Sequence, residues 1–251
     1  MRFDEFDARM RRGETFHGLR VPPGAFIVVR VDGRAFSRLT ARLVEKPFDV
    51  GFHRWMIDAA KGILTTLHAV CAFTESDEIS VLLPRDTGIF DREVEKLVSI
   101  SAARAAAVVS VACGQPVEFD GRLWIGGQEE DVVDYFRWRQ ADAGRCSLSG
   151  WCYWTLRSHG TTAREAARIL EGASLASKHK LLRDHGVDFD GVPAWQRRGT
   201  ALLWERCEKP GFDPRTGKAV VASRRKIVSD SDLPTGHAYA AYVRRLIAST
   251  R

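Results

Sequence analysis

The sequence predicts an α+β fold built on a ferredoxin-like βαββαβ unit. β-Branched and apolar runs predict a strand at residues 25–31 and a hairpin of two strands at 70–84. Apolar residues at helical spacing predict helices over 49–69 and 91–112. A further strand-like segment, residues 115–124, completes the order strand, helix, strand, strand, helix, strand that defines this unit.

The first strand ends on a carboxylate. Val and Ile residues favour a buried strand over 25–31, Asp32 follows it, and Gly33 interrupts the pattern. An Asp at the edge of a sheet, followed by a turn with free backbone N–H groups, can hold a metal or a phosphate. The structural alternative is an Asp that caps a short helical turn over residues 32–40.

The predicted hairpin carries polar residues at its tip, Ser76, Asp77 and Glu78. Neighbouring carboxylates repel each other, so a purely structural turn would more often contain Asn-Gly or Asp-Gly. In the ferredoxin-like unit the first and third strands are antiparallel neighbours, which brings the end of one beside the start of the other. We therefore expect Asp32 and Asp77 to converge and to share a divalent cation.

Two carboxylates and a backbone carbonyl suit a pair of Mg²⁺ ions, because hard cations prefer oxygen ligands. Such ions about 4 Å apart orient the attacking and leaving oxygens in phosphoryl or nucleotidyl transfer. The backbone N–H groups of residues 33–37 are expected to cradle a triphosphate, with the Lys46 ammonium nearby.

Composition bounds the class of protein. The chain has 251 residues, of which 45% are hydrophobic, enough for one large domain with a closely packed extension. Its five cysteines form no C-x-x-C pair and its seven histidines show no metal-ligand spacing, so neither a disulfide framework nor a zinc ribbon is predicted. The charged N-terminus and the lack of a run of about 18 apolar residues predict a cytoplasmic protein without a membrane span.

Charge divides the chain in two. Residues 1–136 carry 17 Lys and Arg against 21 Asp and Glu, a net charge of −4, whereas residues 137–251 carry 21 against 11, a net charge of +10. We expect a catalytic domain over 1–136 that holds cations, and an extension over 137–251 that binds a polyanion.

The extension is predicted to be mainly helical. Expected helices cover 129–158, 162–171, 173–185 and 236–248, and expected strands cover 200–207 and 218–228. Thr162 and Glu165 form a capping-box pattern. The turn GFDPRTGK between the strands lacks the Ser or Thr that follows the lysine of a phosphate loop, so a hairpin turn is predicted. Residues 1–20 are expected to include a short helix packed on the domain.

Seven sequence blocks identify a family. They are RVDGRAFSRLT (30–40), EKPFD (45–49), TESDEIS (74–80), FDGR (119–122), WRQAD (138–142), LASKHKLL (175–182) and WQRRGTALLW (195–204). In this order they resemble the histidine-tRNA guanylyltransferases and the guanylyltransferase-like proteins, which are 3′-to-5′ polymerases. The resemblance implies a polymerase-type palm with a basic, helical C-terminal extension, assembled as a homotetramer.

The resemblance also assigns roles to residues. Asp32, the Gly33 carbonyl and Asp77 would bind two Mg²⁺ ions, with Ser76 and Glu78 as further catalytic residues beside them. The residues implied to bind the nucleotide, GTP or ATP, are Gly33, Arg34, Ala35, Phe36, Ser37 and Lys46. The residues implied to bind tRNA are Arg122, Arg139, Arg145, Lys178, Arg197 and Arg198. Taken singly, each could equally lie on a solvated face, but the matching blocks favour contact for Arg139 and Lys178. The tryptophans at 151, 154, 195 and 204 are expected in the core, because they fall on apolar stretches.

Two departures from the family pattern separate the branches. Eukaryotic members carry an HINNLYNT-like block where this chain has GRCSLSGW, residues 144–151. The form of residues 142–145 looks like the bacterial guanylyltransferase-like branch, whose members add template-matched nucleotides to 5′-truncated tRNAs. Ala35 and Ser37 replace the second glycine and the histidine of the family's D-G-R-G-F-H turn.

The function that the sequence predicts is therefore Mg²⁺-dependent, template-dependent nucleotide addition to the 5′ end of tRNA. Addition of G at position −1 of histidine tRNA is the nearest alternative. A palm-type nucleotide cyclase is disfavoured by the basic C-terminal half, and a non-catalytic RNA-binding protein is disfavoured by the presence of both Asp32 and Asp77. An acyl-phosphate phosphatase would need an Asp where Arg34 stands.

Overall fold

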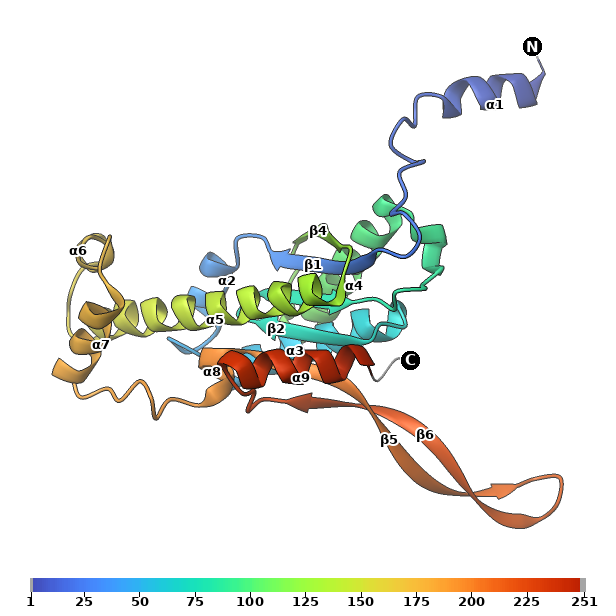
Figure 1. The fold of residues 1–251 in the computed structure, drawn as a ribbon. Helices are drawn as coiled ribbons and strands as arrows, with labels where there is room; N and C mark the ends of the chain where they lie inside the picture. Colours follow the sequence, from blue (N-terminus) through green and yellow to red (C-terminus); the bar gives the residue numbers. More distant parts are fainter. Residues whose placement is uncertain (1, 249–251) are drawn as a thin grey trace.

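The computed structural model describes residues 2–248, and within them an antiparallel sheet of six strands has helices on both faces (Figure 1). The strand order is β4-β1-β3-β2-β5-β6. The strands are β1 (Phe26–Gly33), β2 (Cys71–Glu75), β3 (Glu78–Leu82), β4 (Phe119–Gly126), β5 (Thr200–Asp213) and β6 (Lys218–Asp230).

The first four strands confirm the predicted ferredoxin-like unit, because their order, β4-β1-β3-β2, places the first and third strands side by side. Helix α3 (Val50–Thr66) joins β1 to β2, and α4 (Val94–Cys113) joins β3 to β4. Asp49 caps α3, since its side chain accepts a hydrogen bond from the Phe52 N–H at 2.7 Å. The stretch predicted as a turn after Asp32 instead contains a helix, α2 (Phe36–Leu43).

Period-two alternation along the strands supplies two apolar faces. One face, with Ile27, Val29 and Val31 of β1, packs against α3 and α4. The other face, with Phe26 and Val28, packs against α5 (Glu129–Ser158) and the C-terminal helix α9 (Gly236–Ala248). Figure 1 shows α5 and α9 lying side by side across this second face. Helices on both faces explain why the strands of the palm are apolar throughout.

The C-terminal strands extend the palm sheet. β5 pairs with β2, from Cys71 opposite Leu203 to Thr74 opposite Thr200, and β6 pairs with β5. The predicted strands at 200–207 and 218–228 are confirmed and continue into a long hairpin that projects from the body of the molecule (Figure 1). The turn at its tip joins Asp213 to Lys218, as predicted for a hairpin.

The far half of α5 carries a small separate core. Helices α6 (Ala163–Leu170), α7 (Leu175–Asp184) and α8 (Ala194–Arg198) follow α5 in the chain. Leu148 and Cys152 of α5 pack there against Leu182, Phe189 and Val192. The N–H of Glu165 donates to the Thr162 hydroxyl at 3.3 Å, so the predicted helix start is confirmed.

The N-terminal helix differs from the expectation. α1 (Phe3–Arg11) forms, but none of its side chains, all within the described residues, is buried. Figure 1 shows it standing away from the sheet. Its apolar side chains, Phe3 and Met10 among them, are too few and too widely separated by charges to bury a face against the palm. The predicted packing of this helix on the domain is therefore wrong.

Among residues 2–248, α4 alone is long and apolar enough to cross a membrane by length and composition. One face of this helix packs against α3 and β4, with Leu97, Ala105 and Val109 buried. In this fold α4 covers one face of the sheet with its buried side.

A buried arginine fixes the loops at the end of the sheet remote from Asp32. Arg92 is 7% exposed, and its backbone φ of 58° lies in the left-handed region. Its guanidinium donates to the carbonyl oxygens of Val21, Pro22, Ala25, Arg85 and Thr87 at 2.8 to 3.2 Å. One side chain thus satisfies the backbone of two loops that have no strand partners at these positions.

Arg92→Lys is expected to lower the free energy of unfolding by about 2–4 kcal/mol, because an ammonium has three donors and leaves buried carbonyl oxygens unpaired. Chemical denaturation measures the change. Arg54→Lys, on the exposed side of α3, is the matched control and is expected to change stability by less than about 0.5 kcal/mol. Equal effects of the two substitutions would contradict the role given to Arg92.

Candidate active site

The pairing of β1 with β3 brings the two predicted carboxylates to one corner of the sheet. Asp32 lies opposite Glu78 in the register, and the N–H of Gly33 donates to the Asp77 carbonyl oxygen at 3.0 Å. Asp32 and Asp77 therefore sit beside each other although 44 residues separate them in the sequence. The hairpin tip turns sharply at Ser76, whose φ is 47°, and the Ser76 hydroxyl donates to Asp77 Oδ1 at 3.1 Å.

The two carboxylates repel each other. Burial raises the pKa of Asp77 to about 6, and the Asp32 carboxylate acts in the same direction. Burial also raises the pKa of Asp32, as does the Asp120 carboxylate opposite it on β4. A corner with two partly buried carboxylates and only oxygen donors fits divalent cations such as Mg²⁺, because a cation would offset the repulsion.

The turn after Asp32 depends on a glycine. A Cβ added at Gly33 would lie 2.4 Å from the Phe36 ring, so only glycine permits this approach. The Phe36 ring is buried and packs edge-on against Phe119, with 4.9 Å between centroids. Ala35 has a φ of 59°, in the left-handed region where the family's glycine would be unstrained.

A cavity of about 560 Å³ opens beside Asp77. Its walls come from α2, the loop 44–49, the start of α3 and the hairpin tip on one side, and from α5 and α8 on the other. Of the predicted nucleotide-binding residues, Phe36, Ser37 and Lys46 line it. Arg34 points elsewhere, since its guanidinium is exposed and pairs with Glu118 at 2.9 Å.

Aromatic side chains line much of this cavity. Trp195 stacks on His53, with 4.1 Å between ring centroids and 9° between ring planes. The centroid of the Trp154 ring lies 5.7 Å from the Lys46 ammonium nitrogen. The expectation that these two tryptophans belong to the core is wrong. Apolar neighbours in the sequence predicted burial, but α5 and α8 present both rings to the cavity, a contact between distant segments that no local pattern reveals.

Lys46 is positioned for an anion. Its ammonium donates to the Thr40 hydroxyl at 2.6 Å, and Asp77 and Asp49 are close enough to raise its pKa, although burial lowers it more strongly. His53 stays neutral at physiological pH, because burial lowers its pKa to about 4, and its Nε2 lies 3.0 Å from the Thr200 hydroxyl.

Arg139 of α5 is the cation of this corner. It donates to both carboxylate oxygens of Glu78, at 2.6 and 2.7 Å, to Glu75 at 3.1 Å and to Asp142 at 3.0 Å. Its side chain is 6% exposed, which argues against the tRNA contact predicted for it. Glu78 is also buried and pairs with Arg139, so the structure shows it in an ion pair, and its catalytic role stays a prediction.

The other predicted tRNA-binding residues divide into two groups. Arg122 and Arg145 keep half or more of their side chains exposed, although they pair with Asp120 and Asp142. The second group is partly buried and hydrogen-bonded within the protein: it consists of Lys178, Arg197 and Arg198. Lys178 donates to the Ser149 hydroxyl, and Arg198 donates to the Leu233 carbonyl oxygen. Arg197 donates to the carbonyl oxygens of Val192 and Asp190.

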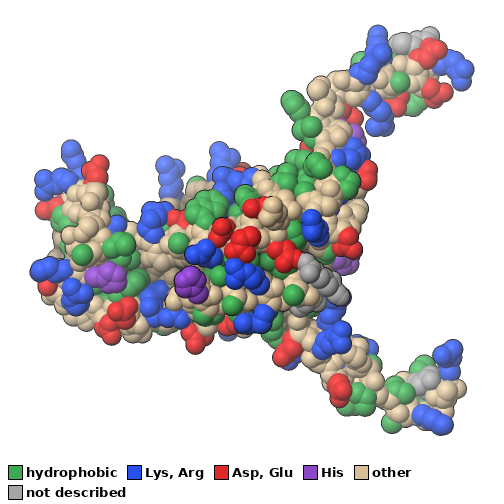
Figure 2. Space-filling model, in the orientation of Figure 1, with side chains coloured by type: hydrophobic (Ala, Val, Ile, Leu, Met, Phe, Trp, Pro, Cys, Tyr) green, Lys and Arg blue, Asp and Glu red, His purple; other side chains and the backbone are tan. Residues whose placement is uncertain are grey.

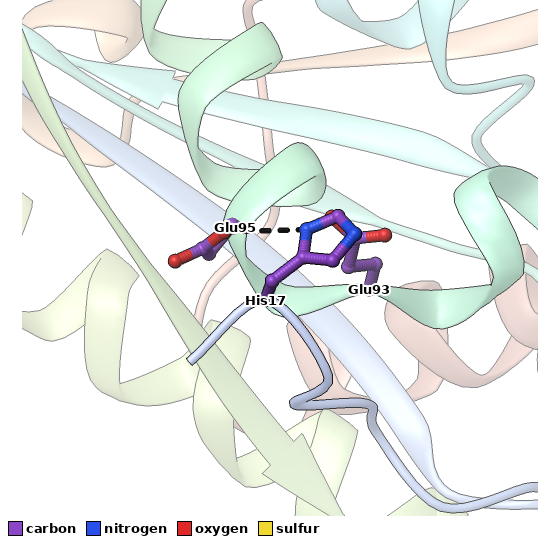
Figure 3. A group of neighbouring side chains, drawn as sticks. All are labelled: His17, Glu93 and Glu95. Atoms are coloured by element: carbon purple, nitrogen blue, oxygen red, sulfur yellow. Dashed lines mark ion pairs between the residues drawn. The ribbon is translucent and has the colours of Figure 1, made fainter. Parts of the chain in front are cut away.

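A second group of possible metal ligands lies at the other end of β1. Figure 3 shows the imidazole of His17 turned toward Glu93 and Glu95, at 3.4 and 3.8 Å. Glu93 already pairs with the Lys96 ammonium at 3.0 Å and lies 4.0 Å from Arg20. Because these cations already offset its charge, we interpret the group as an ion-pair clasp that fixes the N-terminal segment to the start of α4.

Glu75 is a titrating group that the sequence did not indicate. Burial raises its pKa to about 8, and the neighbouring Glu78 carboxylate raises it as well. Within reach of Arg139 lie three carboxylates, Glu75, Glu78 and Asp142, so its single charge offsets only part of theirs. Glu75 therefore holds a proton near neutral pH, and its neutral carboxyl lines the cavity.

Because the folded-state pKa of Glu75 lies above that of the unfolded chain, protonation stabilises the fold at acidic pH, and this contribution is lost as pH rises through about 8. Glu75→Gln mimics the neutral form. In EDTA it is expected to melt with the wild type at pH 5 and about 2–4 °C higher at pH 9. Exposed Glu171→Gln is the control. The same difference in melting temperature between Glu75→Gln and the wild type at pH 5 and at pH 9 would refute the assignment.

Comparison with known proteins identifies the family. Residues 7–130 match the family model of the tRNAHis guanylyltransferases (Thg1), and residues 130–233 match that of the Thg1 C-terminal domain. A probable tRNA(His) guanylyltransferase of Drosophila melanogaster is 31% identical over 73% of this chain and 68% of that protein. One of Mus musculus is 27% identical over 82% and 76%.

Solved structures share the fold. A bacterial Thg1-like protein in complex with GTP superimposes with a TM-score of 0.73 at 23% identity, covering 97% of this chain and 99% of that one. The tRNA(His) guanylyltransferase of Saccharomyces cerevisiae gives a TM-score of 0.69 at 24% identity, over 76% and 90%. The match to both family models and the identity with the Drosophila protein show that this chain belongs to the tRNAHis guanylyltransferase (Thg1) family of nucleotidyltransferases.

Proposed function

We propose that the chain is a Mg²⁺-dependent nucleotidyltransferase that adds nucleotides to the 5′ end of tRNA in the 3′-to-5′ direction. The observation that carries the proposal is the convergence of Asp32 and Asp77 at the mouth of an aromatic-lined cavity. In this family of nucleotidyltransferases, that arrangement suits a reaction between a nucleotide in the cavity and an RNA end at the corner of the sheet.

Asp32 and Asp77, with the Gly33 carbonyl, are the residues that would hold two Mg²⁺ ions. When bound, such ions offset the charge of a triphosphate and orient the attacking 3′-hydroxyl and the leaving group. The Ser76 hydroxyl orients Asp77 by its hydrogen bond. Arg139 holds the β2–β3 hairpin in place by its hydrogen bonds to Glu75 and Glu78.

The nucleotide, GTP or ATP, is placed in the cavity. Solved Thg1-like neighbours hold GTP and ATP, which supports the substrate class. Trp154 and Trp195 offer flat apolar surfaces for a base, and Lys46 and the backbone of residues 33–37 offer donors for the phosphates. The base then points away from the sheet and the triphosphate toward Asp32 and Asp77.

The tRNA is placed on the basic C-terminal half. Figure 2 shows Lys and Arg side chains on the end formed by α6 and α7 and at the tip of the projecting hairpin. Among the predicted contacts, Arg122 and Arg145 are exposed enough to reach phosphates. We propose that the protein assembles as a homotetramer, as the family resemblance implies. We also propose a cytoplasmic location, because all five cysteines, which lie within the described residues, are free thiols.

The composition of α5 favours repair over G addition at position −1. On the α5 side, the cavity is lined by the small residues Ala143, Cys146, Ser147 and Gly150, in the region where the eukaryotic pattern has His and Asn, and by Tyr153 and Trp154. Small side chains with few donors discriminate weakly between bases, because selectivity of a protein pocket comes largely from buried polar groups left unpaired by the wrong ligand. We infer that pairing with the opposite base of the acceptor stem selects the nucleotide.

Asp32→Asn and Asp77→Asn are each expected to lower nucleotide addition at least a hundredfold, because an amide is a poor ligand for Mg²⁺. Both variants should melt at or above the wild-type temperature in EDTA, since the substitution removes carboxylate repulsion, and should lose the Mg²⁺-dependent rise in melting temperature. Asp58→Asn, exposed on α3, is the control. More than a tenth of wild-type activity in either variant would rule out the two-carboxylate site.

Template dependence is tested with each of the four NTPs opposite each of the four bases at the stem position of a 5′-truncated tRNA. We expect the Watson–Crick nucleotide to be added in each case, and tRNAs other than the histidine species to be accepted, because the duplex rather than the protein selects the base. Addition of G regardless of the opposite base, and only to histidine tRNA, would establish the alternative activity.

A further inference from the structure

An exposed tryptophan lies near the corner of the sheet where Asp32 and Asp77 meet, here called the carboxylate corner, on the side away from the cavity. Trp138 of α5 is 52% exposed, although large aromatic side chains normally bury most of their surface. It is not among the residues that line the cavity. Its position in the fold therefore calls for an explanation other than core packing or nucleotide binding.

The indole of Trp138 is held in place by its neighbours. The guanidinium carbons of Arg139 and Arg30 lie 4.5 and 5.5 Å from the centre of its ring system, and the Tyr135 ring packs edge-on at 5.8 Å. Arg139 is itself fixed by its bonds to Glu75 and Glu78. An exposed ring that is fixed in this way loses little conformational freedom when a ligand stacks on it.

The strand register relates this ring to the reacting corner. Arg30 precedes Asp32 by two residues on β1, so both side chains stand on the face of the sheet that α5 covers. On the neighbouring strand β4, Arg122 lies opposite Arg30 and Asp120 lies opposite Asp32. Trp138 and the half-exposed Arg122 thus flank Asp32 on the β4 side, whereas the cavity borders Asp77.

We propose that Trp138 is the surface on which the terminal base pair of an RNA acceptor stem stacks, with its 5′ phosphate directed to Asp32 and Asp77. This inference rests on the proposed function and names the part of the protein that positions the RNA end. Every base has a π-face, so stacking on tryptophan holds an RNA end without reading its sequence. That property suits a site in which the duplex selects the nucleotide.

Charge favours RNA over a protein partner at this surface. Arg30 lies beside the ring, and the half-exposed Arg122 lies opposite Arg30 on β4. RNA stacks on aromatic and guanidinium planes while its phosphates accept from Arg. A second copy of this chain is the competing occupant. The experiment therefore measures stacking, kinetics and molecular mass together.

The probe is an acceptor-stem RNA hairpin with 2-aminopurine at the terminal pair, a base whose fluorescence falls when it stacks. Wild-type protein is expected to quench it. Trp138→Ala should lose the quench and raise KM for the RNA about tenfold, with KM for the NTP unchanged. Trp138→Phe, which keeps a ring, should retain most of both. Phe3→Ala, an exposed aromatic of α1, is the matched control and should behave as wild type.

Trp138→Leu guards against a folding defect, because it preserves apolar contact with Arg139 and has no π-face. It should melt near the wild-type temperature and still lose the quench. Wild-type quenching and RNA KM in the Ala or Leu variant would overturn the proposal, as would loss of oligomer mass in light scattering with RNA binding intact. A wild-type protein that quenches the probe but adds no nucleotide would refute the proposed function and leave the stacking surface standing.

Discussion

The guanidinium of Arg139 is the interaction on which the active corner depends. Pairing of β1 with β3 gathers Asp32, Asp77, Glu75 and Glu78 at one end of the sheet, an excess of negative charge in a partly buried place. A single buried cation that meets both glutamates offsets part of this charge, and Glu75 keeps a proton to offset more. Because α5 carries this cation, the ion pairs of Arg139 with Glu75 and Glu78 on the β2–β3 hairpin also hold α5 against the palm. The cavity lies between the palm and α5, so its shape follows from the same ion pairs.

Much of the fold could be predicted because local patterns and global topology agree. The alternation of β1 and the caps Asp49 and Thr162 placed strands and helices within a few residues, and the strand order then implied that Asp32 and Asp77 meet. Side-chain environments were harder to predict. Arginine carries a long apolar stem, and nothing in the sequence near Arg139 indicates that its charge turns inward to Glu78.

The two sides of the carboxylate corner differ in character. The cavity side is concave and aromatic, which suits a single nucleotide that must be surrounded. The β4 side is open, with one fixed ring and a half-exposed guanidinium, which suits the blunt end of a long, stiff duplex that cannot enter a pocket. Both halves of the chain contribute: the acidic first half supplies the carboxylates and one wall of the cavity, and α5 of the basic second half supplies Arg139, Trp138 and the facing wall. Opposite charges thus meet where the chemistry is expected, and the proposed sites would keep a small substrate and a large one on opposite sides of the corner.

Pairing between β2 and β5 has a consequence for synthesis of the chain. Cys71 of β2 cannot pair until Leu203 of β5 has been synthesised. The apolar face of β1 that carries Phe26 and Val28 is not fully covered until α9, with Val243, has also been synthesised. β5 and α9 must therefore be synthesised before the sheet and its apolar face are complete, and the edge of β2 stays open until then. An open edge of five residues invites pairing with another nascent chain. The strand is short and an acidic tip follows it, so the same negative charge that suits a metal ion also opposes such pairing by repulsion between like chains.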